Sequence, residues 1–265
     1  MTKPIIHFSH GNSYPAGSYR KFFNHLGADY DIRYVDMYGH DPAYPVTDGW
    51  PKLVEHLIDT VASYGQPVIL LGHSLGGMLS MMAAKQRPEL ARCVVMLDSP
   101  VVAGWRAVLL KASKGYSWAD NFSPARLSHK RRNVFPDAEA AHQHFINKPM
   151  FAAWAPGVLQ DYLDSGLEPH PEGVQLRFRR EIETEIYRGL PHHLGSLMDD
   201  DYPVPVGFVG GNDSAELRQA GLGATRALVK SNFVEIEGGH LFPMESPAIA
   251  ARLTREMIAR LLVQP

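Results

Sequence analysis

The sequence predicts an α/β fold, a doubly wound and mostly parallel sheet of about six strands with an inserted helical lid. Two observations predict it. At both ends of the 265-residue chain, short apolar runs alternate with helical patterns, as in parallel sheets covered on both faces. From residue 100 to about residue 198 this alternation stops. We therefore expect a core of residues 1–99 and 199–265 and a lid of residues 100–198.

Six short apolar runs are the expected core strands. They are Ile5–Phe8, Ile32–Asp36, Val68–Leu71, Val94–Leu97, Val204–Val209 and Phe233–Ile236. Between and after them, apolar residues recur at helical spacing and share one helix face. These residues are Leu53, Leu57, Ile58 and Val61, and then Ile249, Leu253, Met257, Ile258 and Leu261.

The expected lid is mostly helical. Its helical patterns are short, are separated by Pro and Gly, and fill a segment too long for a connecting loop. They cover Trp105–Lys114, Pro124–Arg132, Asp137–Asn147, Val158–Leu163 and Glu181–Leu190. One strand-like piece, Val174–Phe178, lies among them.

The strand Val68–Leu71 runs directly into Gly72-His73-Ser74-Leu75-Gly76, and a helix-forming stretch follows. In this context G-x-S-x-G is typical of a nucleophile elbow. Glycine at positions 72 and 76 lets the strand and the helix approach closely. Ser74 is then expected in a strained backbone conformation with its hydroxyl exposed.

Composition is that of a soluble globular protein, with 45% apolar and 20% charged residues. The net charge of −2 gives no reason to expect nucleic acid as a partner. No apolar stretch approaches the roughly 20 residues that span a bilayer, and the N-terminus has no signal-peptide pattern. The single cysteine, Cys93, is expected to be a buried structural thiol. A cytoplasmic protein, monomeric or homodimeric, is the resulting expectation.

Neither a cofactor nor a metal is expected. The chain has no G-x-G-x-x-G or Walker-type loop for a nucleotide. His142-Gln143-His144 and His192-His193 lack the i, i+4 spacing with a Glu that marks a hydrolytic zinc site. Solvated or hydrogen-bonded histidines are therefore the better interpretation.

Four motifs carry a family resemblance: Phe8–Asn12, Gly72–Gly77, Gly210–Asp213 and Gly238–His240. Through them the chain resembles the α/β-hydrolase superfamily over essentially its whole length, in the serine-nucleophile, esterase-like branch with a helical cap. The family usually begins with an antiparallel hairpin, and here the strand before His-Gly starts at residue 4. The expected sheet is therefore a reduced one that lacks this hairpin.

The order of nucleophile, acid and histidine in this family is Ser…Asp/Glu…His. It implies Ser74 as nucleophile and His240, after the last expected strand, as the base that activates it. Asp213, at the end of the penultimate strand, is the favoured acid. Asp98 is the alternative acid, because it ends the strand Val94–Leu97, although Asp98 also suits a turn or helix cap.

The oxyanion hole implied by the resemblance consists of two backbone N–H groups, those of Leu75 and Asn12. The Asn12 side chain is either a third donor or simply a turn former. His10, His40 and His73 match motif positions that are usually structural, so no proton-transfer role is expected for them.

Residues 101–135 carry an excess of positive charge, seven Lys or Arg against the single acid Asp120. They include Lys130, Arg131 and Arg132. A solvated surface is one explanation, and a basic rim that attracts anionic substrates is the other.

These features predict a serine hydrolase that cleaves a small carboxylic ester, or a thioester or lactone, through an acyl-serine. C–C bond hydrolysis and perhydrolase activity on the same triad remain open. An alternative from another class is a ligand-binding receptor that retains the triad but barely turns over. The expected partner is a small ester-type molecule, because fold alone does not identify a substrate.

Overall fold

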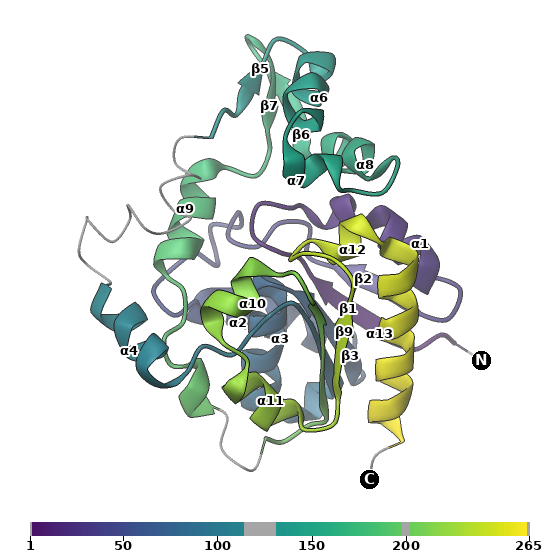
Figure 1. The fold of residues 1–265 in the computed structure, drawn as a ribbon, viewed down its shortest axis with the longest axis vertical. Helices are drawn as coiled ribbons and strands as arrows, with labels where there is room; N and C mark the ends of the chain where they lie inside the picture. The colour runs from purple at the N-terminus through teal and green to yellow at the C-terminus, as the bar shows by residue number, and fades with distance from the viewer. Residues whose placement is uncertain (1, 114–130, 198–201, 264–265) are drawn as a thin grey trace.

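The computed structural model describes residues 2–113, 131–197 and 202–263. Within them, six parallel strands form the central sheet in the order β2-β1-β3-β4-β8-β9 (Figure 1). The strands are β1 (Ile5–Ser9), β2 (Asp31–Tyr34), β3 (Val68–His73), β4 (Ala91–Leu97), β8 (Val206–Gly211) and β9 (Phe233–Ile236). The predicted fold class is confirmed, with each expected strand in place.

The inner strands β1, β3, β4 and β8 are almost entirely buried because helices cover both faces of the sheet. In β1, Ile6 and Phe8 pack into the core on one face of the sheet, and Ile5 packs into the core on the other. In β4, Cys93 and Val95 belong to the first core and neighbouring residues to the second. Such strands read as continuous hydrophobic runs in the sequence, which is why they were predicted well.

Helices α1, α12 and α13 cover one face of the sheet, and α2, α3, α10 and α11 cover the other (Figure 1). Those on the first face are α1 (Arg20–Leu26), α12 (Phe242–Glu245) and α13 (Pro247–Leu262). Those on the second are α2 (Pro51–Ala62), α3 (Leu75–Gln86), α10 (Ala215–Ala220) and α11 (Gly223–Val229). Short 3₁₀ turns η1 (Ala16–Tyr19), η2 (Pro88–Leu90) and η4 (Leu194–Leu197) complete the connections.

The strand order creates a switch point between β1 and β3. From β1 the chain moves outward to β2, and it then crosses back to β3 on the other side of β1. The loops that follow β1 and β3 therefore leave the sheet in opposite directions and open a crevice at its carboxyl edge. Asn12 lies in the first of these loops and Ser74 in the second.

The segment 100–198 combines helices with a small antiparallel sheet of order β5-β7-β6. Its elements are α4 (Gly104–Ser113), β5 (Val134–Phe135), α6 (Ala138–Ile146), α7 (Pro149–Ala152), α8 (Val158–Gly166), β6 (Leu167–His170), β7 (Gly173–Leu176) and α9 (Arg180–Arg188). The predicted strand Val174–Phe178 corresponds to β7, whereas β5 and β6 were not predicted. The predicted helix Pro124–Arg132 falls almost entirely outside the described residues.

The layer formed by β5, β6, β7, α6, α7 and α8 lies over the carboxyl edge of the central sheet (Figure 1). Helix α8 packs on η1, and Arg177 forms an ion pair with Asp36, just beyond β2, at 2.9 Å. The Trp50 indole N–H donates to the carbonyl oxygen of Ile186 in α9 at 3.0 Å. Helix α4 lies apart from this layer, beside α10 and α11 (Figure 1). No helix of the described residues has both the length and the apolar character needed to cross a bilayer.

A buried ion pair joins two parts of the segment 100–198 that are distant in sequence. Arg131 Nη2 lies 2.9 Å from Glu183 Oε2, and both side chains are largely buried. Burial raises the pKa of Glu183, and the nearby Arg131 opposes that rise. Arg131 therefore points inward, whereas the neighbouring Arg132 is exposed and lies over the Phe135 ring at 4.9 Å. The third residue of this basic run, Lys130, lies outside the described residues.

Arg131→Met is expected to lower the free energy of unfolding by about 3 kcal/mol, because it leaves a buried carboxylate without its counter-charge. Urea unfolding followed by circular dichroism measures the change. Arg132→Met is the matched control, and its cost should stay below about 1 kcal/mol because the side chain is exposed. Equal losses for the two variants would show that the Arg131–Glu183 pair does not support the lid.

Candidate active site

The turn between β3 and α3 has the geometry of a nucleophile elbow. Ser74 has φ +52° and ψ −117°, a backbone conformation that residues other than glycine rarely adopt. Its N–H donates to the carbonyl oxygen of Leu97 in β4 at 2.9 Å, which holds the turn against the neighbouring strand. The Ser74 hydroxyl makes no capping hydrogen bond to α3, so it is not tied to the helix.

Two glycines permit this turn. A Cβ at Gly76 would lie 1.9 Å from the carbonyl oxygen of Ser9 in β1, and a Cβ at Gly72 would lie 2.2 Å from Gly76. No side chain fits at such distances. The strand, the turn and α3 therefore approach as closely as the sequence pattern predicts.

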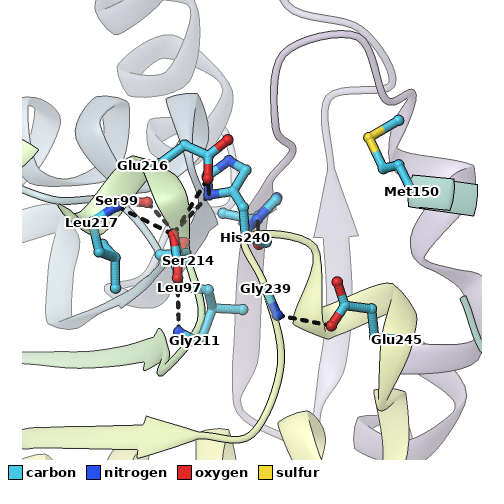
Figure 2. A network of polar contacts seen from close by, with 12 residues as sticks. Leu97, Ser99, Met150, Gly211, Ser214, Glu216, Leu217, Gly239, His240 and Glu245 are labelled. Atoms are coloured by element: carbon cyan, nitrogen blue, oxygen red, sulfur yellow. Dashed lines mark hydrogen bonds and ion pairs between the residues drawn. The ribbon is translucent and has the colours of Figure 1, made fainter. Parts of the chain in front are cut away.

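His240 follows β9 in a Gly-Gly turn that carries its imidazole to the carboxyl edge of the sheet (Figure 2). Glu245 Oε2 accepts a hydrogen bond from the Gly239 N–H at 2.9 Å and so fixes this turn. The carbonyl oxygen of His240 lies 2.9 Å from His73 Nε2, and the two rings are 4.9 Å apart. Because His73 directly precedes Ser74, the loop of His240 lies against the elbow.

The carboxylate that contacts His240 is that of Asp98. Its Oδ1 lies 2.7 Å from His240 Nδ1 and its side chain is fully buried. The Gly211 N–H donates to the other oxygen, Oδ2, at 2.8 Å. The Ser214 hydroxyl donates to Oδ1 at 2.7 Å. Asp98 is thus held on both oxygens in the orientation that His240 requires.

The structure does not bring Asp213 to His240, contrary to the sequence-based preference. The Asp213 side chain is 85% exposed and pairs with Arg218 at 3.2 Å. The reason is the start of α10. Ser214 caps this helix by accepting from the Leu217 N–H at 3.2 Å, which turns Ser214 inward toward Asp98 and its neighbour Asp213 outward. The alternative acid, Asp98, therefore occupies the place expected for Asp213.

The pKa of the His240 imidazole is raised although the residue is buried. Burial disfavours its charged form, but the hydrogen bond and the negative charge of Asp98, with smaller contributions from Glu216 and Glu245, outweigh burial and raise the pKa of His240 above its usual value. Since Nδ1 faces Asp98, Nε2 is the ring nitrogen left for proton exchange.

The two expected oxyanion donors lie in the loops on either side of the switch point. Leu75 is the first residue of α3, where backbone N–H groups have no partner inside the helix. Asn12 is buried in the loop after β1. Its side-chain amide donates to the carbonyl oxygen of Glu183 in α9 at 3.1 Å. The Asn12 side chain therefore ties the loop to α9, which leaves the backbone N–H as the donor to consider.

His73 takes part in a chain of hydrogen bonds that joins the three loops. The Tyr19 hydroxyl accepts from the Gly11 N–H at 3.0 Å, so its own proton goes to His73 Nδ1 at 2.7 Å. His73 Nε2 then donates to the carbonyl oxygen of His240. Burial lowers the pKa of His73 to about 3, so it stays neutral. This structural role is the one predicted.

His10 and His40 also make structural contacts. His10 Nε2 accepts from the Tyr38 N–H at 2.8 Å, and burial lowers its pKa to about 4. His40 Nε2 accepts from the Arg179 N–H, just before α9, at 3.0 Å. Cys93 is fully buried in β4, as expected, and burial raises the pKa of its thiol to about 12. Among the described residues, no three His, Cys, Asp or Glu side chains gather as metal ligands.

Sequence reasoning missed Ser214 and Glu216. Both follow the motif Gly210–Asp213, and a serine before a helix normally signals only a cap. The sequence did offer two possible acids, Asp98 and Asp213. Whichever of them is used needs buried hydrogen-bond donors nearby, and this requirement was the signal available for such residues.

Comparison with known proteins identifies relatives of one kind. A model of the alpha/beta hydrolase family matches residues 8–253. The pimeloyl-[acyl-carrier protein] methyl ester esterase of Xanthomonas oryzae pv. oryzae (strain MAFF 311018) is 22% identical over 192 residues, which cover 71% of each chain. The 2-succinyl-6-hydroxy-2,4-cyclohexadiene-1-carboxylate synthase of Escherichia coli O1:K1 / APEC is 29% identical over 153 residues, 57% of this chain and 56% of that protein.

Solved structures share the fold. E-2-(acetamidomethylene)succinate hydrolase has a TM-score of 0.76 at 21% identity, covering 97% of this chain and 92% of its own. The thioesterase domain from the curacin biosynthetic pathway has a TM-score of 0.72 at 17% identity, covering 95% and 90%. At these identities the likeness supports the fold alone. The family model spans both the nucleophile elbow and the loop of His240. The chain therefore belongs to the alpha/beta hydrolase family.

Proposed function

We propose that this protein is a serine hydrolase of small carboxylic esters, with Ser74 as nucleophile, His240 as general base and Asp98 as the acid of the triad. The observation that carries the proposal is the 2.7 Å hydrogen bond between His240 Nδ1 and the buried Asp98, beside a serine held at positive φ. A buried carboxylate of this kind orients the imidazole and stabilises its charged form.

In the proposed reaction, the Ser74 hydroxyl attacks the ester carbonyl carbon while His240 Nε2 takes the hydroxyl proton. The negative charge that forms on the carbonyl oxygen is stabilised by the N–H groups of Asn12 and Leu75. As the C–O bond breaks, the imidazolium returns the proton to the departing alcohol. Water, deprotonated by the same nitrogen, then attacks the acyl carbon. The bond to Ser74 Oγ breaks, the imidazolium returns its proton to Oγ, and the carboxylic acid leaves.

The ester class is supported by the relatives of this chain, which include a methyl ester esterase. We propose the described part of residues 100–198 as a lid whose contacts over the carboxyl edge shape the acyl pocket. The single test is labelling with a fluorophosphonate, followed by turnover of p-nitrophenyl esters of increasing acyl length. Labelling with continuous product release supports an esterase. Labelling without turnover of any ester would favour the receptor alternative.

The pH dependence of kcat/KM should follow His240, because only the neutral imidazole accepts the proton of Ser74. Activity is expected to fall as pH decreases through the pKa of His240, with the midpoint above the usual value of about 6.5. His10 and His73, with pKa values of about 4 and 3, stay neutral over this range. The measurement is kcat/KM for an uncharged ester from pH 5 to 9. A midpoint below about 6 would contradict the Asp98–His240 assignment.

A further inference from the structure

A second carboxylate lies beside His240. Glu216, in the first turn of α10, places Oε2 3.9 Å from His240 Nδ1, the same nitrogen that contacts Asp98 (Figure 2). The two acids differ in environment, since Asp98 is fully buried whereas the Glu216 side chain is 51% exposed. At 3.9 Å a carboxylate attracts an imidazolium appreciably, but exposure screens that attraction.

Ser214 connects the two acids. Its hydroxyl lies 2.7 Å from Asp98 Oδ1 and 3.4 Å from Glu216 Oε2. A hydroxyl has a single proton, so the shorter contact to Asp98 takes it. The Ser214 oxygen also accepts from the Leu217 N–H, which caps α10. Ser214 thereby fixes Asp98 and begins the helical turn that holds Glu216 next to His240.

Three other titratable or charged groups near His240 belong to the described residues: Glu245, His73 and Arg218. Glu245, from α12, is bound to the Gly239 N–H and adds a weaker negative charge. His73, at the end of β3, lies against the imidazole but is neutral. The cation on α10, Arg218, is paired with Asp213. Negative charge therefore dominates the electrostatic field at His240, and Glu216 contributes its charge from the solvent-exposed side.

We propose that Glu216 is a positioning residue, a second carboxylate that acts with Asp98 on His240 Nδ1 and stabilises the imidazolium from the solvent side. The proposal rests on the proposed role of His240 as base. It has a distinctive consequence: the contribution of Glu216 weakens with salt, because the charge is exposed, whereas that of the buried Asp98 does not.

The test begins with an NMR titration of His240, assigned by the signal lost in His240→Gln. In Glu216→Gln the pKa of His240 should fall at low salt, and the difference from the parent protein should shrink at 1 M salt, where the screening length is about 3 Å. Glu237→Gln is the matched control, because it removes an exposed carboxylate three residues before His240 in the same loop. An unchanged pKa in Glu216→Gln, or an equal fall in Glu237→Gln, overturns the proposal.

Kinetics in two backgrounds completes the test. Glu216→Gln should lower kcat/KM about two- to fivefold in the parent protein, as expected for an exposed charge pair. In the Asp98→Asn background Glu216 is the nearer remaining acid, so the same change should cost more, roughly tenfold. Equal factors in both backgrounds would show that the two acids act independently, against the proposal. Because the titration needs no substrate, a failure to hydrolyse esters would refute the proposed function without affecting this result.

Discussion

Replacing Ser74 by alanine is expected to lower kcat for ester hydrolysis by at least ~10³-fold, because binding and oxyanion stabilisation alone remain. The change should leave the fold intact. The Ser74 hydroxyl makes no capping hydrogen bond, and alanine meets the same backbone strain at φ +52° that serine does. Steady-state turnover and fluorophosphonate labelling measure the effect, and labelling should disappear with activity.

Ser80→Ala is the matched control for this variant. Ser80 lies on α3, is fully buried, and its hydroxyl has no hydrogen-bond partner among the described residues. Its replacement should change neither turnover nor labelling. If Ser74→Ala kept near-normal esterase activity while Ser80→Ala lost it, the elbow serine would not be the nucleophile.

The centre of the sheet was predictable because its inner strands β1, β3, β4 and β8 are buried on both faces and therefore appear in the sequence as apolar runs. The segment 100–198 was less predictable. Strand β6, Leu167–His170, contains Pro169 and a charged residue, so no alternation marks it. Arg131 belongs to a basic run that resembles a solvated surface, and its partner Glu183 is distant in sequence. Only the tertiary structure shows that Arg131 is paired.

The candidate site was likewise predictable from the sequence only in part. Chain order and local pattern were enough to select Ser74 and His240, since the elbow and the loop after the last strand are local features. The choice between Asp98 and Asp213 was not local. Both residues follow the end of a strand, and the direction of the Asp213 side chain depends on where α10 begins. Ser214 sets that start by capping the helix, and one sequence does not reveal which of two adjacent polar residues will turn inward.

The decisive comparison is therefore between two conservative changes. Asp98→Asn is expected to lower kcat by roughly 10³- to 10⁴-fold, because an amide neither compensates the imidazolium nor holds the Nδ1–H tautomer of His240. Asp213→Asn should change kcat by no more than about twofold, because its exposed carboxylate pairs with Arg218 rather than with His240.

Both variants retain the shape of the side chain, so the same folded structure is compared in each case. In the Asp98→Asn variant the amide oxygen can still accept from the Gly211 N–H, and the amide NH2 can donate to the Ser214 hydroxyl oxygen, which keeps part of the buried network satisfied. Turnover of one uncharged ester, with circular dichroism to confirm folding, measures the pair. If Asp213→Asn were instead the damaging change, the loop after β8 would have to rearrange during catalysis, and Asp213 would be the acid of the triad. If Asp98→Asn alone is damaging, the buried end of β4 supplies that acid.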